Sequence, residues 1–196
     1  MVRAAVGVGQ EGRRTRPVSC VIEASQPDAA DLAAVARQLG RTPRGVMAVV
    51  HRCPCGLPDV VQTMPRLPDG TPFPTLFYLT CPRASAAMST LEAAGEMRAM
   101  TARLRTDPTL AERYAAAHRD YLARREAAAR QAGQDPLPAG TQSAGGMPDR
   151  VKCLHALAAH ALAVPGVNPL GAEAVEAAGL WWESGPCTPD ERQADE

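Results

Sequence analysis

The sequence predicts an α+β fold, in which a small three-stranded antiparallel meander packs against several α-helices in a single domain. Three short runs rich in Val, Phe, Tyr and Thr lie within residues 45–80, as expected for strands. From Ala84 onward, apolar residues recur at helical spacing instead. The chain has 196 residues and is 45% hydrophobic, which is enough to bury one core.

The first predicted element is a helix over residues 27–39. Residues of capping type and a proline open it, and Leu32, Val35 and Leu39 follow one apolar stripe. Gly40 is a typical helix end.

Three strands follow, at residues 45–52, 58–67 and 72–80. The pair Asp69-Gly70 suits a tight reversal between the second and the third. Proline has no N–H group to donate to a neighbouring strand, so the second and third strands must begin or end near their prolines. The prolines concerned are Pro65, Pro72 and Pro74.

The second half of the domain is predicted to be helical. Met97, Met100 and Leu104 recur at helical spacing, and Asp107-Pro108 then starts a helix that runs to about residue 131. The apolar stripe of that helix comprises Leu110, Tyr114, Ala117 and Tyr121.

A stretch rich in Pro, Gly and Ser over about 132–147 is expected to be a flexible linker. Pro148-Asp149 is then predicted to open a helix that reaches about Val164. A last short helix follows, with Asn168 as its cap and Pro169 at its first position.

The two ends of the chain are polar and show no period, so we expect mobile tails at 1–26 and 183–196 around a domain at 27–182. The formal net charge is zero, which gives no general attraction to nucleic acid. No run approaches the roughly 20 apolar residues of a membrane span, and no signal peptide is recognisable. We therefore expect a cytoplasmic protein with no nucleic-acid or membrane partner, and the sequence identifies no protein partner.

Six cysteines in a reducing compartment indicate metal ligands or catalytic thiols rather than disulfides. In a meander the end of the first strand and the end of the third lie on the same rim, about 10 Å apart. Cys53 and Cys55 follow the first strand and Cys81 follows the third, so they share this rim. Cys20 and Cys187 lie in unpatterned terminal stretches and are interpreted as incidental.

Cys153 joins this rim if the helix predicted from residue 148 packs over it. Cysteines from three separate segments, two of them followed by proline, favour an iron–sulfur cluster. Zinc is the alternative, although zinc sites usually contain a C-x₂₋₄-C pair and only C-x-C occurs here.

Around Cys153 the sequence offers further candidates. Cys153 and His155 are about 200° apart on a helical wheel, so both face one site only if the helix begins between them. Cys55 or His155 is the candidate fourth ligand. His160 shares the stripe of Cys153 and is predicted to orient a ligand or transfer protons. Lys152, the only lysine, is predicted either to balance the negative charge of a thiolate-rich centre or to bind a small anionic substrate.

Three functions stay open on this evidence. The first is a protein with an iron–sulfur cluster or another metal, acting on a small anionic or sulfur-bearing substrate. The second is a non-catalytic, zinc-stabilised interaction module. The third is a metal-free enzyme with Cys153 as nucleophile and a histidine as base. Against all three, buried cysteines are often ordinary core residues.

Three motifs resemble a bacterial family, largely actinobacterial, that is known as a domain of unknown function. They are HRCPCG at 51–56, TPFPTLFYLTCP at 71–82 and VKCLHALAAH at 151–160, and the likeness covers about residues 30–180. The resemblance implies recurrent cysteines at the positions of Cys53, Cys81 and Cys153, with other residues often found in place of Cys55. It thus implies a three-cysteine site that leaves one iron open, and a cellular link to cell division or polyphosphate metabolism.

Overall fold

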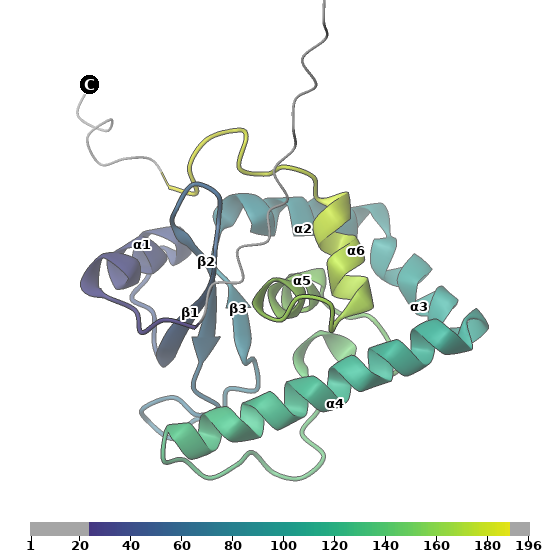
Figure 1. The fold of residues 1–196 in the computed structure, drawn as a ribbon, viewed down its shortest axis with the longest axis horizontal. Helices are drawn as coiled ribbons and strands as arrows, with labels where there is room; N and C mark the ends of the chain where they lie inside the picture. Colours follow the sequence, from purple (N-terminus) through teal and green to yellow (C-terminus); the bar gives the residue numbers. More distant parts are fainter. Residues whose placement is uncertain (1–23, 189–196) are drawn as a thin grey trace, which may run out of the picture.

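The structure is a computed structural model, and it describes residues 24–188. These residues form an α+β body, which confirms the predicted fold class (Figure 1). The predictions made for residues 1–23 and 189–196, including that for Cys20, lie outside the described residues. In chain order, the elements are α1 (Ala29–Leu39), β1 (Val46–Arg52), β2 (Pro58–Thr63), β3 (Phe77–Leu79), α2 (Pro82–Ala94), α3 (Glu96–Thr106), α4 (Pro108–Gln131), a 3₁₀ turn η1 (Ala144–Gly146), α5 (Leu154–Ala163) and α6 (Pro169–Ala177).

The sheet is the predicted antiparallel meander, with strand order β1-β2-β3. The second and third strands are shorter than predicted, because β2 ends at Thr63 and β3 begins only at Phe77. Both prolines of the third run lie before β3, where no ladder donor is needed. The predicted reversal is present: Gly70 has a φ of 82° and donates its N–H to the carbonyl of Leu67.

Helix α5 lies between the sheet and α6, and α1 covers the opposite face of the sheet (Figure 1). Because α5 is enclosed in this way, most of its side chains are apolar and buried, including Leu154 and Leu157. Helix α4 runs along one side of the body, and the side chains of its predicted stripe are all buried. The core therefore lies between β3, α5, α4 and α6.

Helix α1 begins and ends as its sequence indicates. Asp28 and Asp31 form a reciprocal capping box at the start, and Gly40 ends the helix in the left-handed conformation with a φ of 64°. Helix α6 likewise starts with Asn168 as its cap and Pro169 at its first position, as predicted.

The segment between α4 and α5 is tied to its surroundings by hydrogen bonds. The buried guanidinium of Arg125 donates to the carbonyls of Thr141 and Gln142. The amide of Gln134 donates to the carbonyl of Arg66 and accepts from its N–H. This segment thus fixes the approach of the chain to α5.

Helix α5 begins at Leu154, six residues later than predicted. Tertiary hydrogen bonds occupy the backbone that precedes it. The carbonyl of Arg150 accepts from the Tyr114 hydroxyl, and the N–H of Val151 donates to Thr101 Oγ1. These bonds hold residues 148–153 in a non-helical conformation.

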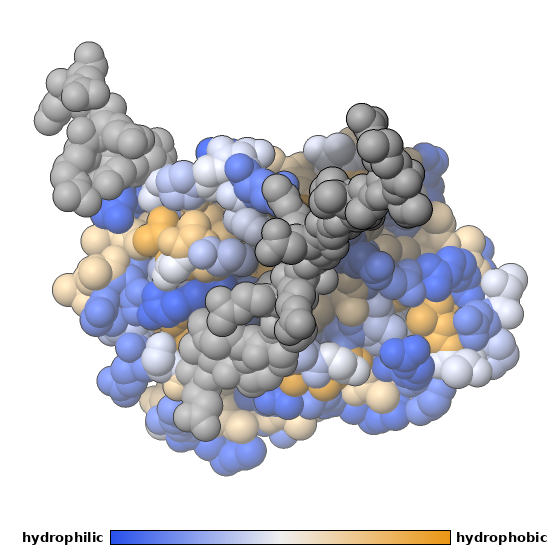
Figure 2. Space-filling model, turned by 45° about the horizontal axis from the view of Figure 1, so that its top comes forward, coloured by the Kyte–Doolittle hydropathy of each residue, from blue (hydrophilic) through white to orange (hydrophobic). Residues whose placement is uncertain are grey.

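Among residues 24–188, no helix has the length and apolarity to cross a lipid bilayer. On the face drawn in Figure 2, hydrophilic and hydrophobic residues are interspersed.

Candidate functional site

Four cysteines from three distant parts of the chain meet at one end of the sheet. We call them the four-cysteine cluster: Cys53, Cys55, Cys81 and Cys187. Cys53 and Cys55 lie in the loop between β1 and β2, where the N–H of Gly56 donates to the carbonyl of Cys53. That turn directs both side chains toward the same place.

Cys81 joins the cluster from the end of β3. It is the N-cap of α2, and its sulfur accepts a hydrogen bond from the N–H of Ala84. Cys187 arrives from the C-terminal segment beyond α6. This segment is fixed at the start of α2 because Arg83 Nε donates to the carbonyl of Pro186 at 2.9 Å.

The four sulfurs are close together. Cys187 Sγ lies 2.8 Å from Cys81 Sγ and 3.4 Å from Cys55 Sγ. The sulfurs of Cys53, Cys55 and Cys187 all lie within 4.8 Å of one another, and Cys81 contacts this group through Cys187. Cysteines from separate segments therefore form a cluster that can hold a metal ion.

The electrostatics of the cluster favour a thiolate at Cys81. Hydrogen bonds from Cys187 and Cys53, and then from the N–H groups of Ala84 and Arg83, lower the pKa of Cys81. The pKa of Cys187 is raised, because its thiol donates to Cys53 and Cys81 and is buried. Metals bind thiolates, so a helix N-terminus in this place favours metal binding.

The interpretation of Cys187 as incidental is wrong, because this residue lies within the cluster. Sequence patterns could not indicate this: no periodic element contains Cys187, and its position depends on how the chain folds back over α2. The only local signal was the Pro186-Cys187 pair, which mirrors the Cys-Pro pairs at Cys53 and Cys81.

Cys153 does not reach this rim. Its neighbour is Glu92, which follows Cys81 by eleven positions, about 16 Å along the axis of α2. Because α5 lies along the face of the sheet with its start against the second half of α2, it brings Cys153 to a different place. There Cys153, His155 and Glu92 form a second group, which we call the thiol site.

Both Cys153 and His155 face the thiol site because the helix begins between them. Cys153 is the N-cap of α5 with extended backbone (φ −155°, ψ 112°), and His155 lies in the first turn. Cys153 Sγ is 3.8 Å from His155 Nδ1, which is 3.2 Å from Glu92 Oε1. On the other side of the ring, Nε2 lies 3.1 Å from the carbonyl oxygen of Ser85 and 3.4 Å from Ser89 Oγ.

His155 is surrounded by groups that stabilise its charged form. The hydrogen bond with Cys153, followed by that with the Glu92 carboxylate, raises the pKa of His155 to about 9, against the effect of burial. Both ring nitrogens have an acceptor within reach, as an imidazolium requires. The ring is therefore a proton donor beside the sulfur at neutral pH.

Sequence reasoning did not identify Glu92. Its carboxylate also accepts a hydrogen bond from the N–H of Leu154 at 2.6 Å, so it fixes the start of α5 and orients the His155 ring. A single glutamate in a helix gives no sequence signal for this role, because the contact depends on the packing of α2 against α5.

The thiol site opens into a pocket of about 850 Å³ beside β3. Residues of β3, Ser85 and Ser89 of α2, and Cys153 and His155 line the pocket. This volume lies in the range of small-molecule sites.

The two other predicted site residues lie elsewhere. His160 is fully buried and stacks on Phe77, with ring centroids 5.7 Å apart. Asn168 donates to its Nδ1 at 3.3 Å, and its Nε2 lies 3.2 Å from Asp120. Burial lowers the pKa of His160, so this ring is a neutral core residue away from both groups of cysteines.

Lys152 is exposed, and its ammonium group makes no hydrogen bond or ion pair with residues 24–188. Its assignment to an anionic substrate remains a prediction.

The fold and the two sites define a class of protein: an α+β domain with a cysteine cluster at one end of its sheet and a cysteine–histidine–glutamate group beside a pocket. The chain belongs to the family described as protein of unknown function (DUF501), whose model matches residues 49–176. This confirms the resemblance drawn from the three motifs. Neither a curated protein nor a solved structure matches the chain. The thiol site and three cysteines of the cluster lie within the matched range, whereas Cys187 lies beyond it.

Proposed function

We propose that the four-cysteine cluster binds one zinc ion, which joins the β1–β2 loop, the start of α2 and the C-terminal segment. The closeness of the sulfurs is the observation that supports this most directly. Four thiolates bound to one zinc ion at about 2.3 Å stand about 3.8 Å apart. The sulfurs of Cys53, Cys55 and Cys187 lie within 4.8 Å of one another, which suits this spacing. Cys81 Sγ lies 2.8 Å from Cys187 Sγ, so Cys81 has to move slightly away from Cys187 to join them around the ion.

The same separations favour zinc over the iron–sulfur cluster expected from the sequence. In a cubane cluster each thiolate binds a different iron, so the sulfurs must stand farther apart than around one ion. In the sequence, single cysteines far apart favoured a larger centre. In the structure, Cys187 stands beside Cys53 and Cys55 and takes the place expected for Cys153.

Metal analysis of purified protein tests the proposal. We expect about one zinc per chain, and at least roughly tenfold faster release of zinc to a chelator from Cys81→Ser and Cys187→Ser. Cys153→Ser is the matched control and should retain zinc like the wild type. Iron with sulfide in the protein, no bound metal, or loss of zinc in the control alone would overturn the proposal.

A second function is supported by the thiol site. Cys153 is placed to act as a nucleophile, since its sulfur lies beside a protonated His155, at a helix start and at the edge of a large pocket. In such a reaction the Cys153 thiolate forms a bond to an electrophilic carbon of the substrate. The bond to the leaving group breaks, and His155 gives that group its proton. Glu92 holds the imidazolium in place.

Selective alkylation tests this second function. In zinc-loaded protein at neutral pH, iodoacetamide should modify Cys153 before any other cysteine, as mapped by peptide mass spectrometry. His155→Gln should slow the modification about tenfold, because it removes the neighbouring positive charge. Equal rates in the two proteins, or prior modification of the cluster cysteines, would contradict a nucleophilic Cys153.

A further inference from the structure

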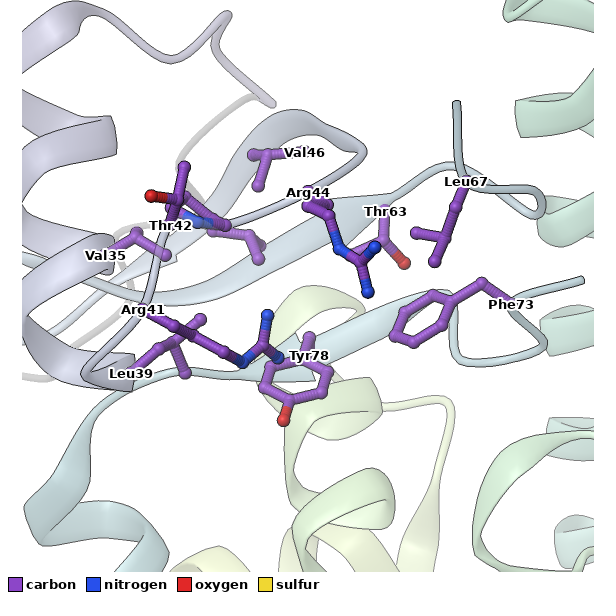
Figure 3. Close-up of a pocket in the computed structure, with 12 residues that line it drawn as sticks. Val35, Leu39, Arg41, Thr42, Arg44, Val46, Thr63, Leu67, Phe73 and Tyr78 are labelled. Atoms are coloured by element: carbon purple, nitrogen blue, oxygen red, sulfur yellow. The ribbon is translucent and has the colours of Figure 1, made fainter. Parts of the chain in front are cut away.

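A second pocket, of about 320 Å³, lies on the face of the sheet that α1 covers (Figure 3). The end of α1, the loop before β1 and the segment between β2 and β3 enclose it. We propose that this pocket binds a small organic anion with a planar apolar body, such as an aromatic carboxylate or an aromatic phosphate ester.

The positive charge of the pocket comes from Arg41 and Arg44, which extend over it from the loop after α1 (Figure 3). Both side chains are exposed, and neither guanidinium makes a hydrogen bond or ion pair with residues 24–188. Hydrogen bonds from Thr71, and to a lesser extent the positive charge of Arg44, lower the pKa of Asp69, which is exposed, but Arg44 and Asp69 form no ion pair. Two guanidinium groups at one opening, with their donors unused, are suited to a carboxylate or phosphate.

The apolar part of the pocket suits a flat ring. Phe73 and Tyr78 stack with ring centroids 6.4 Å apart and an interplanar angle of 29°. Both are half-buried, so part of each ring faces the pocket. The floor is aliphatic and is formed by Val35, Val46, Val61 and Leu67. An aromatic ligand can pack against these rings while its anionic group reaches the arginines.

The size of the pocket limits the ligand. A volume of about 320 Å³ is at the lower end of the range for small-molecule sites, so it fits one ring system with one charged group better than a dinucleotide. Leu39 and Tyr78 also line the pocket of the thiol site, so the two pockets adjoin. The anion therefore binds beside the pocket of the thiol site and does not contact Cys153 or His155.

Titration calorimetry of the full-length chain with four probes tests the proposal. Phenyl phosphate and benzoate combine ring and charge, whereas phenol has the ring alone and inorganic phosphate the charge alone. We expect phenyl phosphate or benzoate to bind at least about tenfold more tightly than either single-feature probe. The tighter of the two identifies the charged group that the pocket prefers.

Variants then locate the binding. Arg44→Gln should weaken the preferred probe about tenfold, because a charge-assisted hydrogen bond is lost. Arg113→Gln, an equal change of charge at an exposed position of α4, should leave binding unchanged. Equal binding of phenol or inorganic phosphate, an Arg44→Gln protein that binds like the wild type, or no binding of either combined probe would each overturn the proposal.

Discussion

At the scale of single residues, the chemistry around Cys153 depends on where one helix begins. Because α5 starts at Leu154, Cys153 keeps an extended backbone and its sulfur turns toward the His155 ring. Had the helix started at Asp149, the two side chains would have pointed about 200° apart. Glu92 fixes this start through its hydrogen bond from the N–H of Leu154, so one carboxylate both positions Cys153 and orients the His155 ring.

The charge of His155 predicts a pH dependence of stability. Its pKa is about 9 in the folded protein and 6.5 as the ordinary value. A raised folded pKa stabilises the fold fully below the unfolded pKa, and this contribution disappears as the pH rises through the folded pKa. We expect the stability advantage of the wild type over His155→Gln to shrink by about 1 to 2 kcal/mol between pH 6.5 and pH 9.

Urea unfolding at a series of pH values measures this difference. The His118→Gln variant is the control, because burial lowers the pKa of His118 and no such loss is expected above pH 6.5. An advantage of the wild type over His155→Gln that stays constant or grows toward pH 9 would show that His155 is not held as an imidazolium.

At the scale of elements, the position of α6 depends on close contact with α5. A Cβ atom at Gly171 would overlap the carbonyl oxygen of Leu157 and would lie 3.0 Å from Ala161 Cβ. Only glycine lets the two helices approach so closely, and α5 in turn carries Cys153 and His155.

We therefore expect Gly171→Ala to lower the free energy of unfolding by about 1 to 3 kcal/mol, as overpacking does. Ala172→Ser, an added atom at the neighbouring exposed position, should stay within about 0.5 kcal/mol of the wild type. Urea denaturation compares the two. A Gly171→Ala protein as stable as the wild type would mean that the helices can separate at little cost.

The elements themselves were largely predictable. Hydrophobic period, capping residues and prolines identified the meander, the stripe of α4 and the start of α6 at Asn168, because these signals act locally. The start of α5 was not predictable, since hydrogen bonds that the backbone of residues 150 and 151 makes with Tyr114 and Thr101 hold it out of the helix. Such bonds join residues that are far apart in the sequence.

At the scale of the whole molecule, the four-cysteine cluster joins the β1–β2 loop and the start of α2 to the C-terminal segment. The meander geometry indicated that Cys53, Cys55 and Cys81 would lie on one rim, and the structure places them together there. The return of Cys187 depends on the path of the chain after α6, which no local pattern specifies. The positions of three cysteines of the cluster therefore follow from local sequence patterns, whereas the position of Cys187 depends on the complete fold.

Removal of zinc should weaken the connection between the C-terminal segment and the rest of the domain. We expect a strong chelator to lower the thermal midpoint by roughly 10 °C, because several kcal/mol of metal binding are lost. Hydrogen exchange should rise first in residues 183–188, which Arg83 and the cluster hold at the start of α2. The Cys187→Ser protein should respond less. A midpoint that chelation leaves unchanged would mean that the ion does not hold the fold together.

X-ray absorption at the zinc edge of the purified wild-type protein tests the four-cysteine zinc centre most directly. We expect a first shell of four sulfur atoms at about 2.3 Å, with no nitrogen or oxygen ligand. A shell that contains nitrogen or oxygen, or an iron edge with neighbouring iron atoms in place of zinc, would contradict it.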